Sequence, residues 1–408
     1  MSMISGQSGL SRCSYHRNLR YDRSFFLRLK DETLFRQAAL VGGRWIAAGK
    51  DGIAVKNPAT GETIGHVPNL GATETLEAIV AAENSQRQWS TRTARERSDT
   101  MRRWFGLMMD NKEDLGRILT IEQGKPLNEA INEVAYGASF IEWFAEEAQR
   151  LYGDITPGHQ IDKRILIIKQ PVGVVAAITP WNFPNAMVTR KVGPAIAAGC
   201  AIVLKPASQT PFSAIAIALL AERAGVPSGL FSVVTGSARE IGMEMTSSPS
   251  SEAQLYSSTE IGSRLYANCA PTIKKLSLEL GGNAPFIVFD DADLDCAVEG
   301  AILAKFRNNG QTCVCANRFY VQNGVYDTFA ERLSKAASEL KIGNGLDDGV
   351  ALGPLIDSNA MKKVEEHVND AVSKGGLLLT GGGRHEQGGS FYKATVLAEA
   401  NRNMLLAR

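Results

Sequence analysis

A cysteine and a glutamate, each beside small residues, are the side chains of this sequence best suited to covalent chemistry. Cys313 follows Gly310-Gln311-Thr312, and Glu279 lies 34 positions earlier in Leu278-Glu279-Leu280-Gly281-Gly282. A thiolate attacks a carbonyl carbon, and a nearby carboxylate can take the proton of the thiol or of a water molecule. We therefore expect acyl transfer through a thioester, with Cys313 as nucleophile and Glu279 as base. The leucines beside Glu279 predict a buried strand, where a carboxylate is expensive unless it has a function.

A third motif, Pro180-Trp181-Asn182-Phe183-Pro184, supplies an amide for a developing oxyanion. We expect Asn182 to share that role with the backbone N–H of Cys313. The three motifs, in their order along the chain, resemble the aldehyde dehydrogenase superfamily. The resemblance covers about residues 31–408. The run Cys313-Val314-Cys315-Ala316-Asn317-Arg318 is most similar to the succinate-semialdehyde dehydrogenases of that family.

The resemblance implies a reaction and a substrate. Cys313 would attack an aldehyde to give a thiohemiacetal, hydride would pass to a nicotinamide, and water would open the resulting thioester. The substrate would be succinate semialdehyde, oxidised to succinate in the degradation of 4-aminobutyrate.

The resemblance also implies where a dinucleotide binds, although the chain has no G-x-G-x-x-G motif. Lys205 matches the family lysine that meets the adenosine ribose. Many NAD-preferring members have Glu where this chain has Ser208, so the missing negative charge favours NADP, with NAD possible. Gly236 and Ser258 match positions that line adenine and pyrophosphate, and Trp181 is assigned to the same site. The alternative is that Ser208 only begins a polar turn.

Two arginines match positions where succinate-semialdehyde dehydrogenases hold the substrate carboxylate. They are Arg190, in an apolar helical stretch, and Arg307, six residues before Cys313. A guanidinium suits a carboxylate through bidentate pairing, whereas the alternative is two solvated helix arginines. Cys315 is close enough in sequence to Cys313 to form a reversible disulfide under oxidation, or it is a packing cysteine. The histidines show no metal-ligand spacing, so we expect no metal site.

The elements that must position these residues alternate between short apolar runs and helices. A helix opened by Thr210-Pro211 and closed by Gly225 separates two of the predicted strands. The resulting βαβαβ pattern predicts a doubly wound sheet. The predicted elements are helices over 73–88, 93–111, 131–151, 294–306 and 326–340, and strands over 174–178, 201–204, 231–234, 286–289 and 319–321. Residues 376–384 are rich in glycine and are expected to form a loop.

The resemblance predicts an α/β fold with a Rossmann-type cofactor domain, a second α/β catalytic domain and a small β arm. The cofactor domain would comprise residues 31–150 and 172–281, the oligomerisation arm 151–171, and the catalytic domain 282–408. The family continues for roughly 80 residues beyond the point where this sequence stops, so we expect a truncated catalytic domain. Residues 250–257 replace an apolar family strand with a polar, apparently shorter segment.

Residues 1–30 stand apart because they hold five arginines, six serines and a single acid, Asp22. That composition is typical of a mitochondrial presequence, and the alternative is an untrimmed upstream start. We expect a cytoplasmic protein, or one of the mitochondrial matrix if the leader is a transit peptide. The net charge of +1 and the lack of a long apolar run give no reason to expect nucleic acid or membrane partners. The expected partners are a small aldehyde and further copies of the chain, as a dimer or tetramer.

Three other functions stay open at this stage. The first is oxidation of another short carboxylated aldehyde, such as glutarate semialdehyde. The second is an inactive pseudoenzyme. The third is a thiol hydrolase, which is disfavoured because no histidine lies in a recognisable partner motif.

Overall fold

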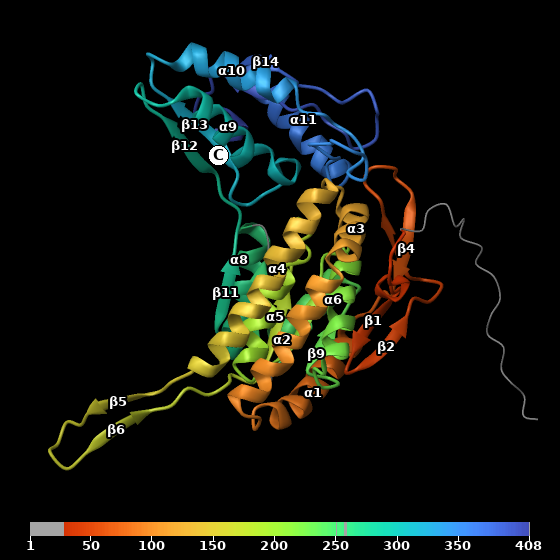
Figure 1. The fold of residues 1–408 in the computed structure, drawn as a ribbon, viewed down its shortest axis with the longest axis vertical. Helices are drawn as coiled ribbons and strands as arrows, with labels where there is room; N and C mark the ends of the chain where they lie inside the picture. The colour runs from red at the N-terminus through yellow and green to blue at the C-terminus, as the bar shows by residue number, and fades with distance from the viewer. Residues whose placement is uncertain (1–27, 250, 257–258, 408) are drawn as a thin grey trace, which may run out of the picture.

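The computed structural model describes residues 28–249, 251–256 and 259–407, and its largest element is a seven-stranded sheet (Figure 1). Five neighbouring strands are parallel, and the two N-terminal strands continue the sheet in antiparallel orientation. The order across the sheet is β11 (Leu276–Glu279), β10 (Ser251–Tyr256), β7 (Val174–Ile178), β8 (Ala201–Lys205), β9 (Phe231–Val233), β1 (Ala38–Val41) and β2 (Arg44–Ala47).

Strands β7, β8 and β9 confirm the predicted βαβαβ unit. They are mostly apolar, with Lys205 at the end of β8 and Ser232 within β9, because both faces of the sheet are covered. Helix α5 (Ala186–Ala197) connects β7 to β8, and α6 (Pro211–Ala224) connects β8 to β9. Pro211 occupies the first turn of α6, and Gly225 ends the helix in the left-handed conformation at φ 91°.

Helices lie on both faces of the sheet, so the fold is doubly wound as expected. Helices α5 and α6 pack on one face, with α2 and α4 outside them, and α1 and α7 pack on the other. The chain order reverses between β7 and β10, which is where such sheets bind ligands at their carboxyl ends. The covering helices are α1 (Ala72–Trp89), α2 (Ala94–Asp110), α3 (Lys112–Gln123), α4 (Leu127–Glu147), α7 (Ala238–Ser247) and α8 (Thr259–Cys269).

The C-terminal part of the chain forms a smaller α/β layer, which lies beyond one end of α3 and α4 in Figure 1. Its parallel strands β12 (Ala284–Val288) and β13 (Ala316–Val321) are joined through α9 (Leu294–Phe306). Its other elements are α10 (Tyr326–Ser338), α11 (Ser358–Ser373), β14 (Leu377–Thr380) and β15 (Val396–Ala398).

Two antiparallel hairpins complete the fold. Strands β3 (Ile53–Lys56) and β4 (Thr63–Val67) pair near the N-terminus, whereas β5 (Asp154–Pro157) and β6 (Arg164–Ile167) form an arm that extends away from the rest of the molecule (Figure 1). The arm carries exposed apolar side chains, including Ile155, Leu166 and Ile168. Within the described ranges, no helix is both long and apolar enough to span a bilayer.

Two sequence-based expectations differ from the structure, and the polar segment noted above forms a strand. The predicted loop over 376–384 contains strand β14, because its leucine run pairs with β15 despite the glycines around it. Helix α4 begins and ends four residues earlier than predicted, since Pro126 precedes its first turn. The polar segment at 250–257 contains β10, which pairs with β7 on one side and β11 on the other. Most of the proposed leader lies outside the described residues.

Candidate active site

The carboxyl ends of four parallel strands, and the loops that leave them, carry most of the candidate residues. Trp181 and Asn182 follow β7, Lys205 ends β8, and Gly236 follows β9. Glu279 is the last residue of β11, and its backbone pairs with that of Tyr256 in β10. Parallel strands present their carboxyl ends at one edge of a sheet, so the fold gathers these residues on a single side. Ser258 lies outside the described residues.

Lys205 is a buried lysine with only 4% of its surface exposed. Its ammonium donates to the carbonyl of Pro206 at 3.1 Å, and burial lowers the pKa of this lysine to about 8. Ser208 is half-buried in the turn between β8 and α6. The residues present fit a phosphate better than a pair of ribose hydroxyls, because an uncharged serine leaves the cation free to bind an anion.

Gly236 is required by close packing of the backbone. It has φ 142° and bridges to Leu70, and a Cβ at this position would lie 2.0 Å from the Leu70 carbonyl oxygen. The structure therefore explains the glycine without a cofactor, and its role in binding adenine or pyrophosphate stays a prediction.

The loop before Cys313 is held in an unusual backbone conformation. Asn308, Asn309 and Gly310 have φ values of 54°, 57° and 71° in succession. A left-handed conformation is uncommon for residues other than glycine and typically costs about 1–3 kcal/mol where it is strained. Asn309 is fixed on both sides of its amide, by the carbonyl of Pro354 at 3.1 Å and the N–H of Gly353 at 2.6 Å.

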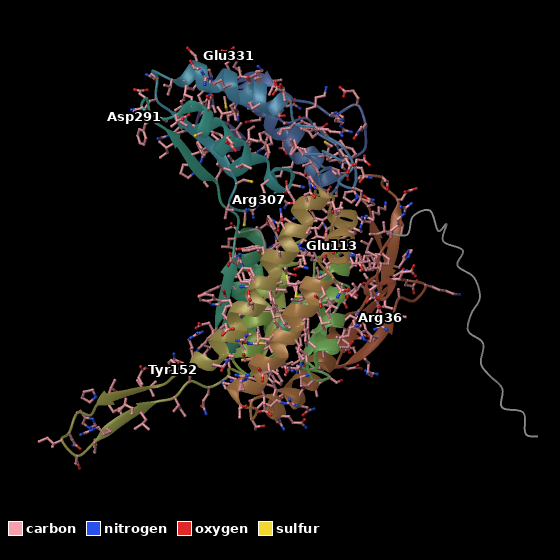
Figure 2. The ribbon with its side chains drawn as sticks, in the orientation of Figure 1. Arg36, Glu113, Tyr152, Asp291, Arg307 and Glu331 are labelled. Carbon is pink, nitrogen blue, oxygen red and sulfur yellow. The ribbon has the colours of Figure 1, made fainter. Side chains whose placement is uncertain are left out.

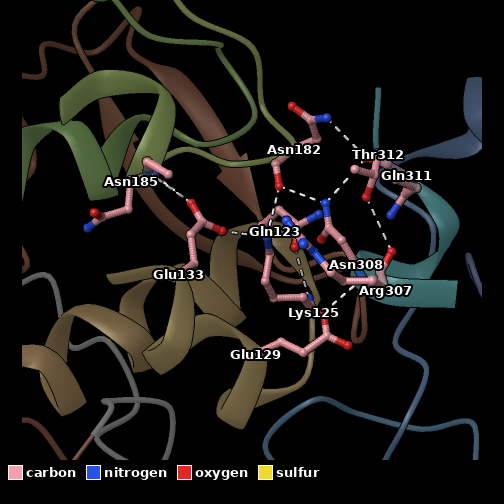
Figure 3. A network of polar contacts seen from close by, with 11 residues as sticks. Gln123, Lys125, Glu129, Glu133, Asn182, Asn185, Arg307, Asn308, Gln311 and Thr312 are labelled. Carbon is pink, nitrogen blue, oxygen red and sulfur yellow. Dashed lines mark hydrogen bonds and ion pairs between the residues drawn. The ribbon is translucent and has the colours of Figure 1, made fainter. Parts of the chain in front are cut away.

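Asn182 contacts this loop directly. Its side-chain amide nitrogen donates to the backbone carbonyl of Gln311 at 3.0 Å. Its backbone carbonyl accepts from the side-chain amide of Asn308 at 2.8 Å (Figure 3). The structure thus brings the proposed oxyanion donor to the loop that carries the proposed nucleophile. Because an amide nitrogen has two N–H groups, one remains for a substrate oxygen.

Cys313 is exposed, and the segment that follows Glu279 approaches it. A Cβ on Gly282 would lie 3.6 Å from the Cys313 carbonyl oxygen. Glu279 itself is exposed, so the expected burial of this carboxylate is wrong. The reason is topological, because among the described residues β11 is an edge strand of the sheet, with a partner strand on one side only.

Lys191 is a nearby residue that the sequence did not single out. It is buried in α5, and burial lowers the pKa of its ammonium while the Glu279 carboxylate opposes that shift. The signal available in the sequence was a lysine next to Arg190 in an otherwise apolar helix.

The two candidate substrate arginines contact different rings of one apolar cluster. Phe140 packs against the cluster formed by Phe183, Ala186 and Met187. The Arg190 guanidinium lies 4.9 Å from the Phe140 ring centroid, and Arg307 lies 5.2 Å from that of Phe183. Arg190 also donates to the Tyr136 hydroxyl at 2.6 Å. Figure 2 shows Arg307 where the C-terminal part of the chain meets the helices below it.

Cys315 is buried, in contrast to the exposed Cys313. Its thiol donates to the carbonyl of Lys305 at 3.3 Å, and its backbone N–H donates to Thr312 at 3.2 Å. The cysteines of the described ranges are free, so the disulfide between Cys313 and Cys315 stays a prediction. The same part of the chain contains no cluster of three or more potential metal ligands.

A buried polar network behind Asn182 was not predicted from the sequence. Its members come from the α3–α4 connection, from α4, and from the loops around Asn182 and before Cys313 (Figure 3). Burial lowers the pKa of Lys125 and raises that of Glu129 in this network. A lysine in the polar run Glu122-Gln123-Gly124-Lys125 reads as a solvated turn, so only the tertiary structure reveals it.

Comparisons with known proteins agree with this geometry. A profile of the aldehyde dehydrogenase family matches residues 45–408. The chain is 62% identical to the glutarate-semialdehyde dehydrogenase of Pseudomonas aeruginosa and 60% identical to the NADP(+) succinate-semialdehyde dehydrogenase GabD of Escherichia coli, with 94% of this chain and 80% of each relative covered. A crystal structure described as an E. coli NADP-dependent enzyme superposes with a TM-score of 0.92 at 60% identity, covering 93% of this chain and 79% of that one.

Proposed function

The chain belongs to the aldehyde dehydrogenase family, and we propose that it oxidises succinate semialdehyde to succinate with NADP+. The observation that carries the proposal is the pair of arginines, Arg190 and Arg307, beside one apolar cluster next to the Asn182 turn. Two cations from different segments suit a short aldehyde whose far end is a carboxylate. The names of the E. coli and Pseudomonas relatives, both semialdehyde dehydrogenases, support the same substrate class.

Each candidate residue then has a defined task. Cys313 attacks the aldehyde carbon, and the free N–H of the Asn182 amide stabilises the oxyanion with the backbone N–H of Cys313. NADP+, when bound, would supply the hydride acceptor. Glu279 takes the proton of the thiol and later activates the water that opens the thioester. The exposed position of Glu279 leaves this carboxylate open to solvent water.

We assign the cofactor to the carboxyl edge of the sheet. Lys205 would pair with the 2′-phosphate of NADP, and the uncharged Ser208 would tolerate it. Trp181, Gly236 and Ser258 would line the remainder of the site. NAD is the alternative cofactor, because its ribose hydroxyls can also accept a hydrogen bond from Lys205.

Glutarate semialdehyde is the alternative substrate. It is longer than succinate semialdehyde by one methylene, and hydrophobic pockets discriminate one methylene by only about 1–3 kcal/mol. Curated relatives named for it are 62% and 60% identical to this chain.

The remaining organisation is proposed from the family. Residues 31–150 and 172–281 would bind the cofactor, and residues 282–408 would supply the thiol. The arm over 151–171 would join copies of the chain as a dimer or tetramer, since its exposed Ile155, Leu166 and Ile168 form an apolar surface that water does not favour. A cytoplasmic location is proposed, with the mitochondrial matrix as the alternative.

The substrate proposal is tested by comparing aldehydes with and without a carboxylate. Purified protein with NADP+ should give a higher kcat/KM for succinate semialdehyde than for butyraldehyde, which has the same number of carbons but no charge to bind. Cys313→Ala should abolish both activities. Equal kcat/KM values for the two aldehydes would contradict the proposed substrate.

A further inference from the structure

Lys125 and Glu133 form an ion pair that is sealed from solvent and has no place in the chemistry above. Their side chains are 1% and 2% exposed, and Lys125 Nζ lies 2.5 Å from Glu133 Oε2 (Figure 3). The free energy needed to dehydrate two buried charges can exceed their attraction, so such a pair is weak evidence for stability. Its partners therefore indicate its role better than its charges do.

The ammonium of Lys125 is directed at the turn that carries Asn182. Lys125 Nζ donates to the Asn182 carbonyl at 2.8 Å and lies 4.1 Å from the centroid of the Phe183 ring. An ammonium has three N–H donors and no acceptor, and these contacts come from consecutive residues of one turn. Lys125 consequently fixes the backbone from which the proposed oxyanion donor projects.

Glu133 ties the same pair to the helix behind that turn. Its Oε1 accepts the N–H groups of Asn185 at 2.9 Å and Ala186 at 3.2 Å, at the N-terminus of α5. A carboxylate is favoured there because the first N–H groups of a helix have no partner within it. Helix α5 carries Arg190, so the ion pair connects the amide turn to one of the proposed substrate arginines.

The cysteine loop completes the network from the other side. Asn308 donates its amide to the Asn182 carbonyl that Lys125 also contacts, and its backbone N–H donates to Glu129 at 2.7 Å. The Asn182 side chain donates to Gln311, two residues before Cys313. Two donors therefore hold the backbone carbonyl of Asn182, and one acceptor holds its side-chain amide.

We propose that Lys125 is a positioning residue for the reaction, which sets the Asn182 amide against the cysteine loop so that its second N–H faces the oxygen of a substrate bound at Cys313. This inference rests on the proposed function for the identity of the reacting group. Lys125 does not touch the substrate and acts through Asn182. A purely structural Lys125 would stabilise the fold without any specific dependence on Asn182.

A double-mutant cycle separates the two roles. Asn182→Ala should lower kcat about 100- to 1,000-fold, as the loss of an oxyanion donor does in other enzymes. Lys125→Met should lower kcat about ten- to hundredfold, because small displacements of a catalytic group are that costly. The kcat of the double variant should lie within about threefold of the kcat of Asn182→Ala alone, since Lys125 then has no side-chain amide left to position. The Kd for NADP should stay unchanged throughout.

The matched control is Arg97→Met. Arg97 is another buried cation, and it donates to the carbonyl of Ala197 at 3.0 Å at the opposite end of α5. Its loss should lower Tm without changing kcat, alone or with Asn182→Ala. If the fold-losses of kcat caused by Lys125→Met and Asn182→Ala multiplied in the double variant, the proposal would be overturned. If Lys125→Met does not fold, Lys125→Met with Glu133→Gln removes both charges and enters the same cycle.

Two further measurements keep this test independent of the proposed substrate. Hydrolysis of p-nitrophenyl acetate acylates a thiol and releases nitrophenolate without a cofactor, so the cycle can be repeated with it. Hydrogen exchange should accelerate at residues 180–186 and 307–312 in Lys125→Met but not in Arg97→Met. Unchanged exchange at both segments would overturn the inference. Normal ester hydrolysis without oxidation of succinate semialdehyde would instead count against the proposed function.

Discussion

At the scale of single residues, the proposed cofactor preference rests on one buried ammonium, Lys205, and one uncharged neighbour, Ser208. Burial lowers the pKa of Lys205 to about 8. A lysine that loses its proton cannot pair with the 2′-phosphate that distinguishes NADP from NAD. Cofactor selection should therefore depend on pH.

We predict that the chain binds NADP more tightly than NAD at pH 7, and that this advantage shrinks as the pH rises through about 8. Above that pKa, binding requires uptake of a proton, so the affinity for NADP should fall up to about tenfold per pH unit. Isothermal titration with both cofactors at several pH values measures this. Ser208→Glu should reverse the preference. Tighter binding of NAD by the unchanged protein would show that this turn has been misread.

The second prediction at this scale concerns the two cysteines of the active-site loop. Peroxide should oxidise Cys313 and Cys315 to a disulfide, with two electrons and two protons passing to the peroxide, and dithiothreitol should restore activity. Cys315→Ala should lose this reversible protection, whereas Cys296→Ala, which alters an exposed cysteine in α9, should keep it. Mass spectrometry of the oxidised protein would refute the idea if no disulfide joined residues 313 and 315.

At the scale of elements, hydrophobic pattern predicted most of the central sheet and little of the network behind it. Val174–Ile178 and Gly225 carry local signals, namely an apolar run and a helix-ending glycine, and both behaved as predicted. The exposure of Glu279 depends on which strand lies at the sheet edge, and no local pattern encodes that. Lys125 looks solvated in sequence because its partners are 8 and 57 residues away.

Glu122 gives the fold a titrating helix cap. Its carboxylate accepts the N–H groups of Phe212 at 2.7 Å and Ser213 at 2.8 Å at the start of α6. Complete burial outweighs these bonds and raises the pKa of Glu122 from 4.5 to about 8. The folded protein thus keeps this proton to a higher pH than the unfolded chain does. The resulting contribution to stability is complete below about pH 4.5 and is lost as the pH rises towards about 8.

We predict that Glu122→Gln flattens the decline of Tm between about pH 5 and pH 8, because glutamine does not titrate. The variant should also lose some stability at low pH, since one of its two side-chain acceptors becomes a donor. Glu113→Gln is the control, because Glu113 is an exposed carboxylate on the same helix, α3. Thermal unfolding measured across this pH range checks the prediction. If Glu122→Gln showed the same slope of Tm against pH as the parent protein and the control, Glu122 would not be protonated in the folded state.

At the scale of the whole molecule, the proposed chemistry requires the sheet and the C-terminal layer to meet. The Asn182 turn leaves the sheet, whereas Arg307 and Cys313 belong to the loop between α9 and β13. Hydrogen bonds from Asn182 and Asn308 join the two parts at this junction. The likeness to solved aldehyde dehydrogenases extends over both parts, since the match covers 93% of this chain. The proposed substrate site therefore lies where residues distant in sequence converge.

The measurement that tests this account most directly is the kcat/KM of Arg190→Ala and Arg307→Ala for succinate semialdehyde and butyraldehyde. A charge-assisted hydrogen bond contributes about 1.5–3 kcal/mol, so either change should lower the value for succinate semialdehyde about ten- to hundredfold. The loss for butyraldehyde should be much smaller, and Arg95→Ala, on the exposed surface of α2, should affect neither aldehyde. Equal losses on the two aldehydes would mean that both arginines are structural and that the enzyme is a general aldehyde dehydrogenase.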